Sequence, residues 1–262
     1  NANASSVANG GSIFDAHSVT VSSDALGTLV FHGEGGDSAQ NAVGDTAAGN
    51  IWDNFDGRTT GAAKLSESGM STNSMHYTLP SMVDGLSVSA SYSPQQSGAA
   101  SSTAYALTYT GVEGLSVSYG KGDENTGSTA TDTDTTTMSA SYAMGSFTLA
   151  YSNNDHSSNV ANKDQETTSY KVSYTVSDEI SVSYGTEEIT KENDAQEAEY
   201  EKLSVSYTSG GMTVTATQAS STDALKTLAT TSLGTSLTIL SIISNDGVLE
   251  RKYLLMYLQV PK

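Results

Sequence analysis

Ile180-Ser-Val-Ser-Tyr184 is the stretch that decides the fold, because three other segments repeat its pattern almost residue for residue. They are Leu86–Tyr92 (LSVSASY), Leu115–Tyr119 (LSVSY) and Leu203–Tyr207 (LSVSY). In each segment apolar side chains occupy every second position, small residues fill the gaps and a tyrosine ends the run. Successive side chains of a strand point to opposite faces, so each segment predicts a β-strand with one apolar and one polar face.

The same alternation, read between turn signals, predicts twelve strands along the chain. Tight connections such as Met144-Gly145 and Ser177-Asp178 join them in pairs, because Gly, Asp and Ser suit the geometry of short turns. The predicted strands cover residues 18–23, 27–34, 74–80, 86–93, 102–110, 114–121, 135–143, 146–153, 167–176, 179–188, 200–208 and 211–219.

The connections between these hairpins are longer, polar and acidic. Three of them span 93–101, 122–134 and 153–166, and the fourth carries Glu187, Glu188, Glu192, Asp194 and Glu197. Short turns at one rim and long loops at the other are typical of outer-membrane barrels, with the short turns towards the periplasm. The expected fold class is therefore all-β, an antiparallel transmembrane β-barrel.

Tyrosine placement supports the same orientation. One row stands just before the short turns and a second row stands just before the long loops. Tyrosine has an apolar ring and a hydroxyl that can stay wet, so two such rows predict aromatic girdles at the two membrane interfaces. The alternative is that tyrosine is simply a good strand residue. The predicted girdle comprises Tyr92, Tyr109, Tyr119, Tyr142, Tyr151, Tyr174, Tyr184 and Tyr207.

Composition excludes several other classes of protein. The 262 residues carry a formal net charge of -18 and no cysteine. High charge with few large apolar side chains also fits a disordered chain, but disorder does not explain the two-residue phasing. A barrel does, because only the lipid-facing half of each strand must be apolar. The acidic charge argues against nucleic-acid binding, and no apolar run is long enough for a transmembrane helix.

The connection from 35 to 73 is unlike the others. A loop this long inside a compact domain is functional or disordered. It holds the single tryptophan, Trp52, with Ile51 and Phe55 nearby. These apolar side chains predict that the loop packs against another part of the protein. Asp37 or Ser38 is expected to cap a short helix through residues 40–43.

The run Ser18–Glu34 (SVTVSSDALGTLVFHGE) resembles the Gram-negative general porins, and the later LSVSY hairpins resemble those of the alphaproteobacterial branch. The resemblance implies a sixteen-stranded trimeric barrel, of which about twelve strands are present here. Both a closed and an incompletely closed barrel are compatible with this number of strands. It implies that 1–17 correspond to a second extracellular loop, 18–220 to the barrel and 35–73 to a loop that folds inward and narrows the pore.

Of the two ends of the chain, the C-terminal one departs from the family. The start, Asn1-Ala-Asn-Ala, has no leader, so a signal peptide is expected to be removed or to lie upstream. Porins end in an amphipathic strand with a terminal aromatic residue, whereas 221–262 are Leu-rich and more basic. This tail is predicted to be atypical and foreign to the barrel, for example through a shift of reading frame.

The resemblance also implies which residues line the constriction. In the family, acidic side chains of the third loop face basic side chains on the opposite wall, and the charge lining a constriction sets selectivity. Ordinary loop solvation is the alternative for each residue. Basic candidates are few, with Lys121, Lys171, Lys202 and Arg251 elsewhere, so either the basic wall belongs to the strands that are missing here or the pore prefers cations. The candidate constriction residues are Glu34, Asp37, Asp45, Asp53, Asp56, Arg58 and Lys64.

Enzymatic function is not expected. His17, His32, His76 and His156 lack metal-ligand spacing, and no hydrolase, nucleotide or metalloprotease motif is present. We expect no cofactor and no metal. The predicted function is an outer-membrane porin for passive diffusion of small hydrophilic solutes and ions, surrounded by lipid and lipopolysaccharide. The alternative is a secreted or surface-exposed β-rich adhesin or surface-layer protein, whose Ser and Thr face water.

Overall fold

One antiparallel sheet contains every described strand of the computed structural model. The structure describes residues 16–54, 70, 72–94, 100–125, 132–192, 197–209, 212–222 and 234–239. Strands that are neighbours in sequence are hydrogen-bonded neighbours in the sheet, from β1 to β13. The strands are β1 (His17–Ser23), β2 (Gly27–Glu34), β3 (Thr72–Thr78), β4 (Leu86–Ser93), β5 (Ser102–Tyr109), β6 (Leu115–Glu124), β7 (Thr133–Met144), β8 (Phe147–Ser158), β9 (Gln165–Thr175), β10 (Ile180–Lys191), β11 (Ala198–Ser209), β12 (Met212–Thr222) and β13 (Gly234–Ile239).

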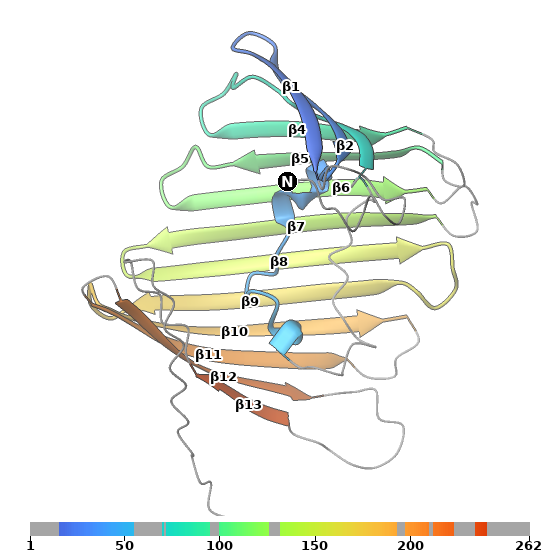
Figure 1. Cartoon of the computed structure of the whole chain (residues 1–262). Coiled ribbons are helices and arrows are strands. Elements are labelled where there is room, and N and C mark those ends of the chain that lie inside the picture. The colour runs from blue at the N-terminus through green and yellow to red at the C-terminus, as the bar shows by residue number, and fades with distance from the viewer. Residues whose placement is uncertain are drawn as a thin grey trace, which may run out of the picture.

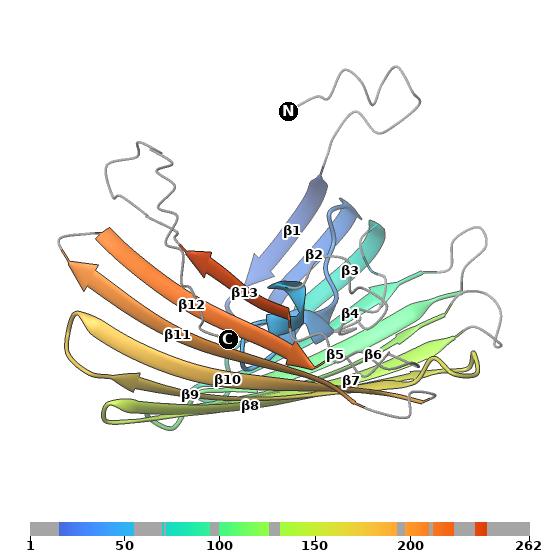
Figure 2. The ribbon, with the colours of Figure 1, turned by 90° about the horizontal axis from the view of Figure 1, so that it is seen from below.

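The sheet is curved into a trough. Figure 1 shows its strands lying side by side, and Figure 2 shows the connection between β2 and β3 on the concave side. The two outer strands, β1 and β13, do not pair with each other, so the described strands do not close the barrel. The expected all-β antiparallel class is confirmed. None of the described helices is long enough to cross a membrane.

Burial shows which face of the sheet is which. On β9, Ser169 is fully buried on the concave face, whereas its neighbour Tyr170 is 56% exposed and Val172 is 38% exposed on the convex face. The same alternation runs through the strands on either side. Because the described strands form a single sheet, their convex apolar side chains do not meet a second described sheet. The small polar side chains therefore face the concave interior and the apolar ones face outward.

The short turns are formed as predicted, but the strands extend further towards the long loops. Gly85 and Gly114 adopt φ of +73° and +77° at two of the tight turns. At the other rim Asp134, Asp155 and Glu166, expected in loops, lie on β7, β8 and β9. The prediction was wrong there because both faces become polar, so the hydrophobic alternation disappears while the backbone ladder continues.

The last strand was not predicted. β12 continues to Thr222, and β13 (Gly234–Ile239) pairs with it from Ala216 opposite Ile239 to Ser221 opposite Gly234. This strand lies inside the segment 221–262 that was expected to depart from the barrel. The remainder of that segment, and residues 1–15, lie outside the described residues, so their assignment stays a prediction.

Candidate functional site: the inward loop

The connection between β2 and β3, called the inward loop and described for residues 35–54 and 70, runs along the concave face of the sheet (Figure 2). It contains two 3₁₀ helices, η1 (Ala39–Val43) and η2 (Ile51–Asn54). Ser38 is the N-cap of η1, and its hydroxyl accepts the backbone N–H of Gln40 at 3.2 Å. The predicted short capped helix is therefore confirmed.

Serine hydroxyls of the sheet hold the backbone of the inward loop. Ser91 on β4 accepts the N–H of Ala39 at 2.9 Å. Ser152 on β8 accepts the N–H of Ala47 at 2.8 Å, and Ser169 on β9 accepts the N–H of Ala48 at 3.0 Å. A loop placed against a wall must satisfy its backbone groups. The polar face of these strands therefore binds the loop as well as lining the interior.

Glu187 on β10 makes the central contact with the inward loop. Its side chain is 1% exposed, one carboxylate oxygen accepts the hydroxyl of Thr46, and the other accepts the backbone N–H of Trp52 at 3.1 Å. A buried carboxylate requires such partners. Glu187 falls in the predicted strand 179–188 but was also counted with an acidic outer loop, and that second assignment was wrong. Its place two residues after Gly185, on the face that continues Ser183, is the signal that was missed.

Lys202 on the adjacent strand β11 supplies positive charge at the same place. Its ammonium group donates a hydrogen bond to the carbonyl oxygen of Gly49 at 3.2 Å. Its charge interacts with the carboxylate of Glu187 and with Lys171 on β9. A lysine that points into the interior thus contacts the inward loop directly, on the wall where the loop is bound.

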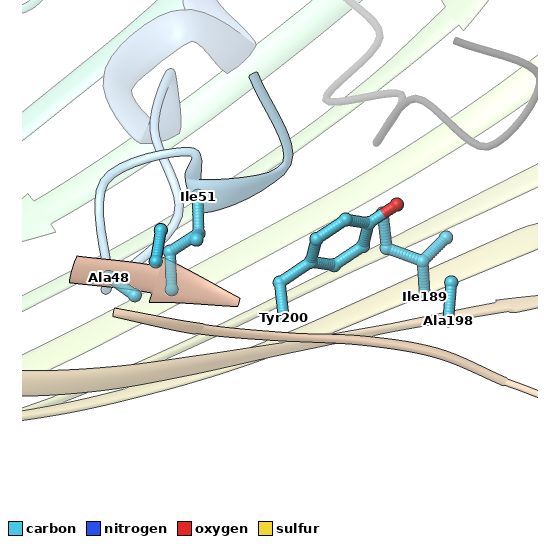
Figure 3. Packing of buried hydrophobic residues seen from close by; sticks show 6 residues of the cluster. Ala48, Ile51, Ile189, Ala198 and Tyr200 are labelled. Carbon is cyan, nitrogen blue, oxygen red and sulfur yellow. The ribbon is translucent and has the colours of Figure 1, made fainter. Parts of the chain in front are cut away.

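Apolar packing holds both helices of the loop. Ile51 is fully buried with Ala48, Ile189 and Tyr200, and Trp52 packs against this cluster. Figure 3 shows the ring of Tyr200 and the side chains of Ile51 and Ile189 near the wall formed by β10 and β11. The predicted packing of Ile51 and Trp52 is confirmed, while Phe55 lies outside the described residues. A second cluster holds η1 and comprises Ala39, Met70, Ala104 and Ala106.

Two glycines let the inward loop come close to the sheet. A Cβ atom on Gly185 would lie 2.7 Å from the Cβ of Ala48, and one on Gly120 would lie 3.0 Å from the carbonyl oxygen of Gln40. Each glycine directly follows the tyrosine of a repeated segment, LSVSY ending at Tyr119 and ISVSY ending at Tyr184. The repeats on β6 and β10 thus differ from those on β4 and β11, where Ser93 and Thr208 follow the tyrosine, although β4 and β11 also contact the loop.

The structure describes only some of the candidate constriction residues. Asp37 and Asp45 are exposed on the inward loop, and they accept hydrogen bonds at 2.7 Å from the side-chain amides of Asn41 and Asn50, respectively. Glu34 ends β2 and is partly buried. Asp53 belongs to η2. The remaining candidates, Asp56, Arg58 and Lys64, lie outside the described residues.

All eight tyrosines of the predicted girdle alternate onto the convex face, opposite the side chains that bind the inward loop. Exposure reaches 45% for Tyr142 and 41% for Tyr184 and Tyr207. Three further convex tyrosines were missed: Tyr77, Tyr105 and Tyr170. Lys121, by contrast, shares the convex face with Tyr119 and cannot line the interior.

Comparison with known proteins was informative for family and fold. The family model of Gram-negative porins matches residues 1–238. None of the curated protein sequences matches the chain significantly. The fold is similar to a porin structure refined at 1.8 Å resolution, with a TM-score of 0.60, 18% identity, and coverage of 84% of this chain and 78% of that one.

Two further solved structures have the same fold. OmpT of Vibrio cholerae, an outer membrane protein described in its trimer form, has a TM-score of 0.56 at 15% identity and covers 88% of this chain and 78% of its own. The anion-selective porin from Comamonas acidovorans has a TM-score of 0.56 at 17% identity, covering 88% of this chain and 74% of its own.

Proposed function

The chain belongs to the Gram-negative porin family and is a porin of the outer membrane, and from this membership we propose that it conducts small hydrophilic solutes passively, with a preference for cations. The family and fold are those of non-enzymatic channels. The inward loop is the proposed constriction, because it occupies the concave face of the sheet and is held there by both polar and apolar contacts. The proposed function therefore depends on the charge that this loop presents.

The exposed carboxylates of Asp37 and Asp45 carry the proposed cation preference. Neither is buried, so both can act on ions passing the loop. The formal net charge of -18 adds to the negative potential of the protein as a whole. Glu187 contributes less, because it is buried beneath the loop and its oxygens are occupied.

Lys171 and Lys202 oppose this preference, since both alternate onto the concave face. The ammonium group of Lys202 is partly occupied, because it donates a hydrogen bond to the carbonyl oxygen of Gly49. The fold does not decide the sign of the preference, as the porin from Comamonas acidovorans is described as anion-selective. The two loop carboxylates and the acidic composition favour cations here.

Reversal potentials in a planar bilayer under a potassium chloride gradient test the proposal. Asp37→Asn together with Asp45→Asn is expected to reduce the ratio of potassium to chloride permeability. Asp178→Asn, at a short turn on the opposite rim, is the matched control and should leave the ratio unchanged. Anion preference of the unmodified protein, or an equal effect of the control, would count against the proposal.

Assembly and surroundings complete the proposal. We propose a homotrimer, supported by the trimer form described for OmpT of Vibrio cholerae. The eight predicted girdle tyrosines would lie at the two membrane interfaces, and the acidic long-loop rim would lie near lipopolysaccharide. An adhesin or surface-layer role is less well supported, because it leaves the exposed apolar convex face without a partner.

A further inference from the structure

Two lysines lie on the concave face of the sheet, next to the turn of the inward loop that contains Ala48 and Gly49. Lys171 on β9 and Lys202 on β11 are both opposite Gly185 of β10, so a single strand separates them. Both alternate with side chains of the convex face, and their charges repel each other across Gly185. The polar interior therefore carries two positive charges in one cross-strand row.

This lysine pair is not the basic wall that the resemblance to porins implies. Such a wall faces the inward loop from the opposite side of the pore, whereas Lys171 and Lys202 belong to strands that bind the loop. Ser169, two residues before Lys171, accepts the N–H of Ala48 at 3.0 Å. The ammonium group of Lys202 itself donates to the carbonyl oxygen of Gly49 at 3.2 Å. The pair is thus a separate feature of the wall, at the edge of the loop.

The part of this wall that the inward loop leaves uncovered lies towards the short turns. Gly185 itself is covered, since a Cβ atom there would lie 2.7 Å from the Cβ of Ala48. The next row towards the short turns has hydroxyl side chains, in the order Ser173, Ser183 and Ser204. All three are partly exposed, as are both lysines. Two ammonium groups and a row of hydroxyls therefore face the interior beside the loop.

Most hydrogen-bond donors of the lysine pair are available to a ligand. Lys171 forms no hydrogen bond with the described residues, and Lys202 uses one of its three N–H groups on Gly49. Glu187 supplies one negative charge against the two positive ones, and its oxygens are bound to the inward loop. An ammonium pair that is only partly neutralised attracts an anion, and charged hydrogen bonds are the stronger ones.

We propose that Lys171 and Lys202, together with the hydroxyl of Ser183, bind the phosphate group of a permeating solute. This site rests on the proposed channel function and adds a class of solute to it. A phosphate group offers three acceptor oxygens, one for each ammonium group and one for the hydroxyl, whereas a carboxylate offers two. Two ammonium groups also favour a doubly charged group over a singly charged one. The exposed carboxylates of the loop still act on freely passing ions, so a local phosphate site and a cation preference are compatible.

Phosphorus NMR of inorganic phosphate tests the site on the purified protein in detergent at low ionic strength. The phosphate resonance should broaden when protein is added, and excess phosphate should saturate the effect. Lys171→Met and Lys202→Met should each weaken binding roughly fivefold, since each removes a charged donor. Lys171→Arg should keep the affinity within about twofold, because the charge remains. Lys121→Met, on the convex face of β6, is the matched control and should bind phosphate as the unmodified protein does.

Three results would overturn the proposal. Broadening that does not saturate would show that there is no defined site. An equal loss in Lys121→Met and Lys202→Met would show that phosphate responds only to overall charge. Sulfate should displace phosphate better than acetate does at equal ionic strength, and equal displacement would mean that the site does not recognise a doubly charged group.

The NMR measurement does not require conduction, so it separates this site from the proposed channel function. A protein that conducts potassium but does not bind phosphate would eliminate the site and leave the channel. A protein that binds phosphate but does not conduct would eliminate the channel and leave the site.

Discussion

The carboxylate of Glu187 on β10 accepts the backbone N–H of Trp52 in η2 at 3.1 Å, across 135 positions of sequence. The other oxygen of the same carboxylate accepts the hydroxyl of Thr46, so one buried side chain joins two points of the inward loop to the sheet. Because Trp52 is the single tryptophan of the chain, this contact also gives the loop an intrinsic fluorescent reporter.

Glu187→Ala is expected to release the second half of the inward loop. It removes two hydrogen bonds to a charged acceptor, worth roughly 3 kcal/mol together, and leaves a buried N–H without its partner. Trp52 fluorescence should shift to longer wavelength and become more accessible to acrylamide, and single-channel current should become noisier. Glu188→Ala, one residue later and on the convex face, is the control and should change neither signal.

Gly185→Val is expected to move the inward loop away from the sheet without removing any hydrogen-bonding group. A Cβ at this position would lie 2.7 Å from the Cβ of Ala48, closer than two carbon atoms can approach. We expect altered single-channel conductance and a loss of stability of roughly 1–3 kcal/mol, as is usual for overpacking. Gly145→Ala cannot serve as the control variant, because Gly145 has a positive φ and any side chain there would strain the backbone. Ser183→Val, on the same face two residues earlier, tests whether bulk alone matters, and an equal effect there would contradict the explanation.

The strands could be predicted because their signal is local. Side chains two positions apart lie on the same face of a strand, so a short run is enough to show which face is apolar. The Ser/Val alternation of segments such as Leu203–Tyr207 marks the membrane-facing part of each strand in this way. The strand ends could not be predicted in the same way. Around Asn153 and Asp155 both faces are polar, and only pairing with β7 and β9 keeps the chain extended.

The contacts of the inward loop were only half predictable. The apolar side chains of Ile51 and Trp52 indicated packing, but not where it would occur. Glu187 was mistaken for a loop charge, because its role depends on a partner far away in sequence. The glycines at 120 and 185 did carry a local signal, since the other LSVSY segments lack glycine there. Comparing the repeats with one another would have identified β6 and β10 as two of the strands that the loop approaches most closely.

Ionic strength is expected to weaken the proposed cation preference. Asp37 and Asp45 are exposed, so mobile ions screen their field, and the Debye length falls from about 10 Å at 0.1 M to about 3 Å at 1 M salt. The permeability ratio of potassium to chloride, measured from reversal potentials at constant gradient, should approach the ratio of the free mobilities at high salt. A ratio that stays constant over this range would indicate selection by buried charge or by size instead.

Lys202→Met is expected to strengthen the cation preference, because it removes a positive charge from the concave face while keeping the length of the side chain. The ammonium group lies beside the inward loop, bonded to Gly49, and its charge interacts with Glu187. A change of one unit charge near the permeation path should raise the potassium-to-chloride permeability ratio roughly twofold at low salt. Lys121→Met makes the same change on the convex face of β6, where the charge is separated from the interior by the sheet. The ratio should not move in that variant. An equal rise in both would mean that the net charge of the protein, rather than the position of Lys202, controls the preference.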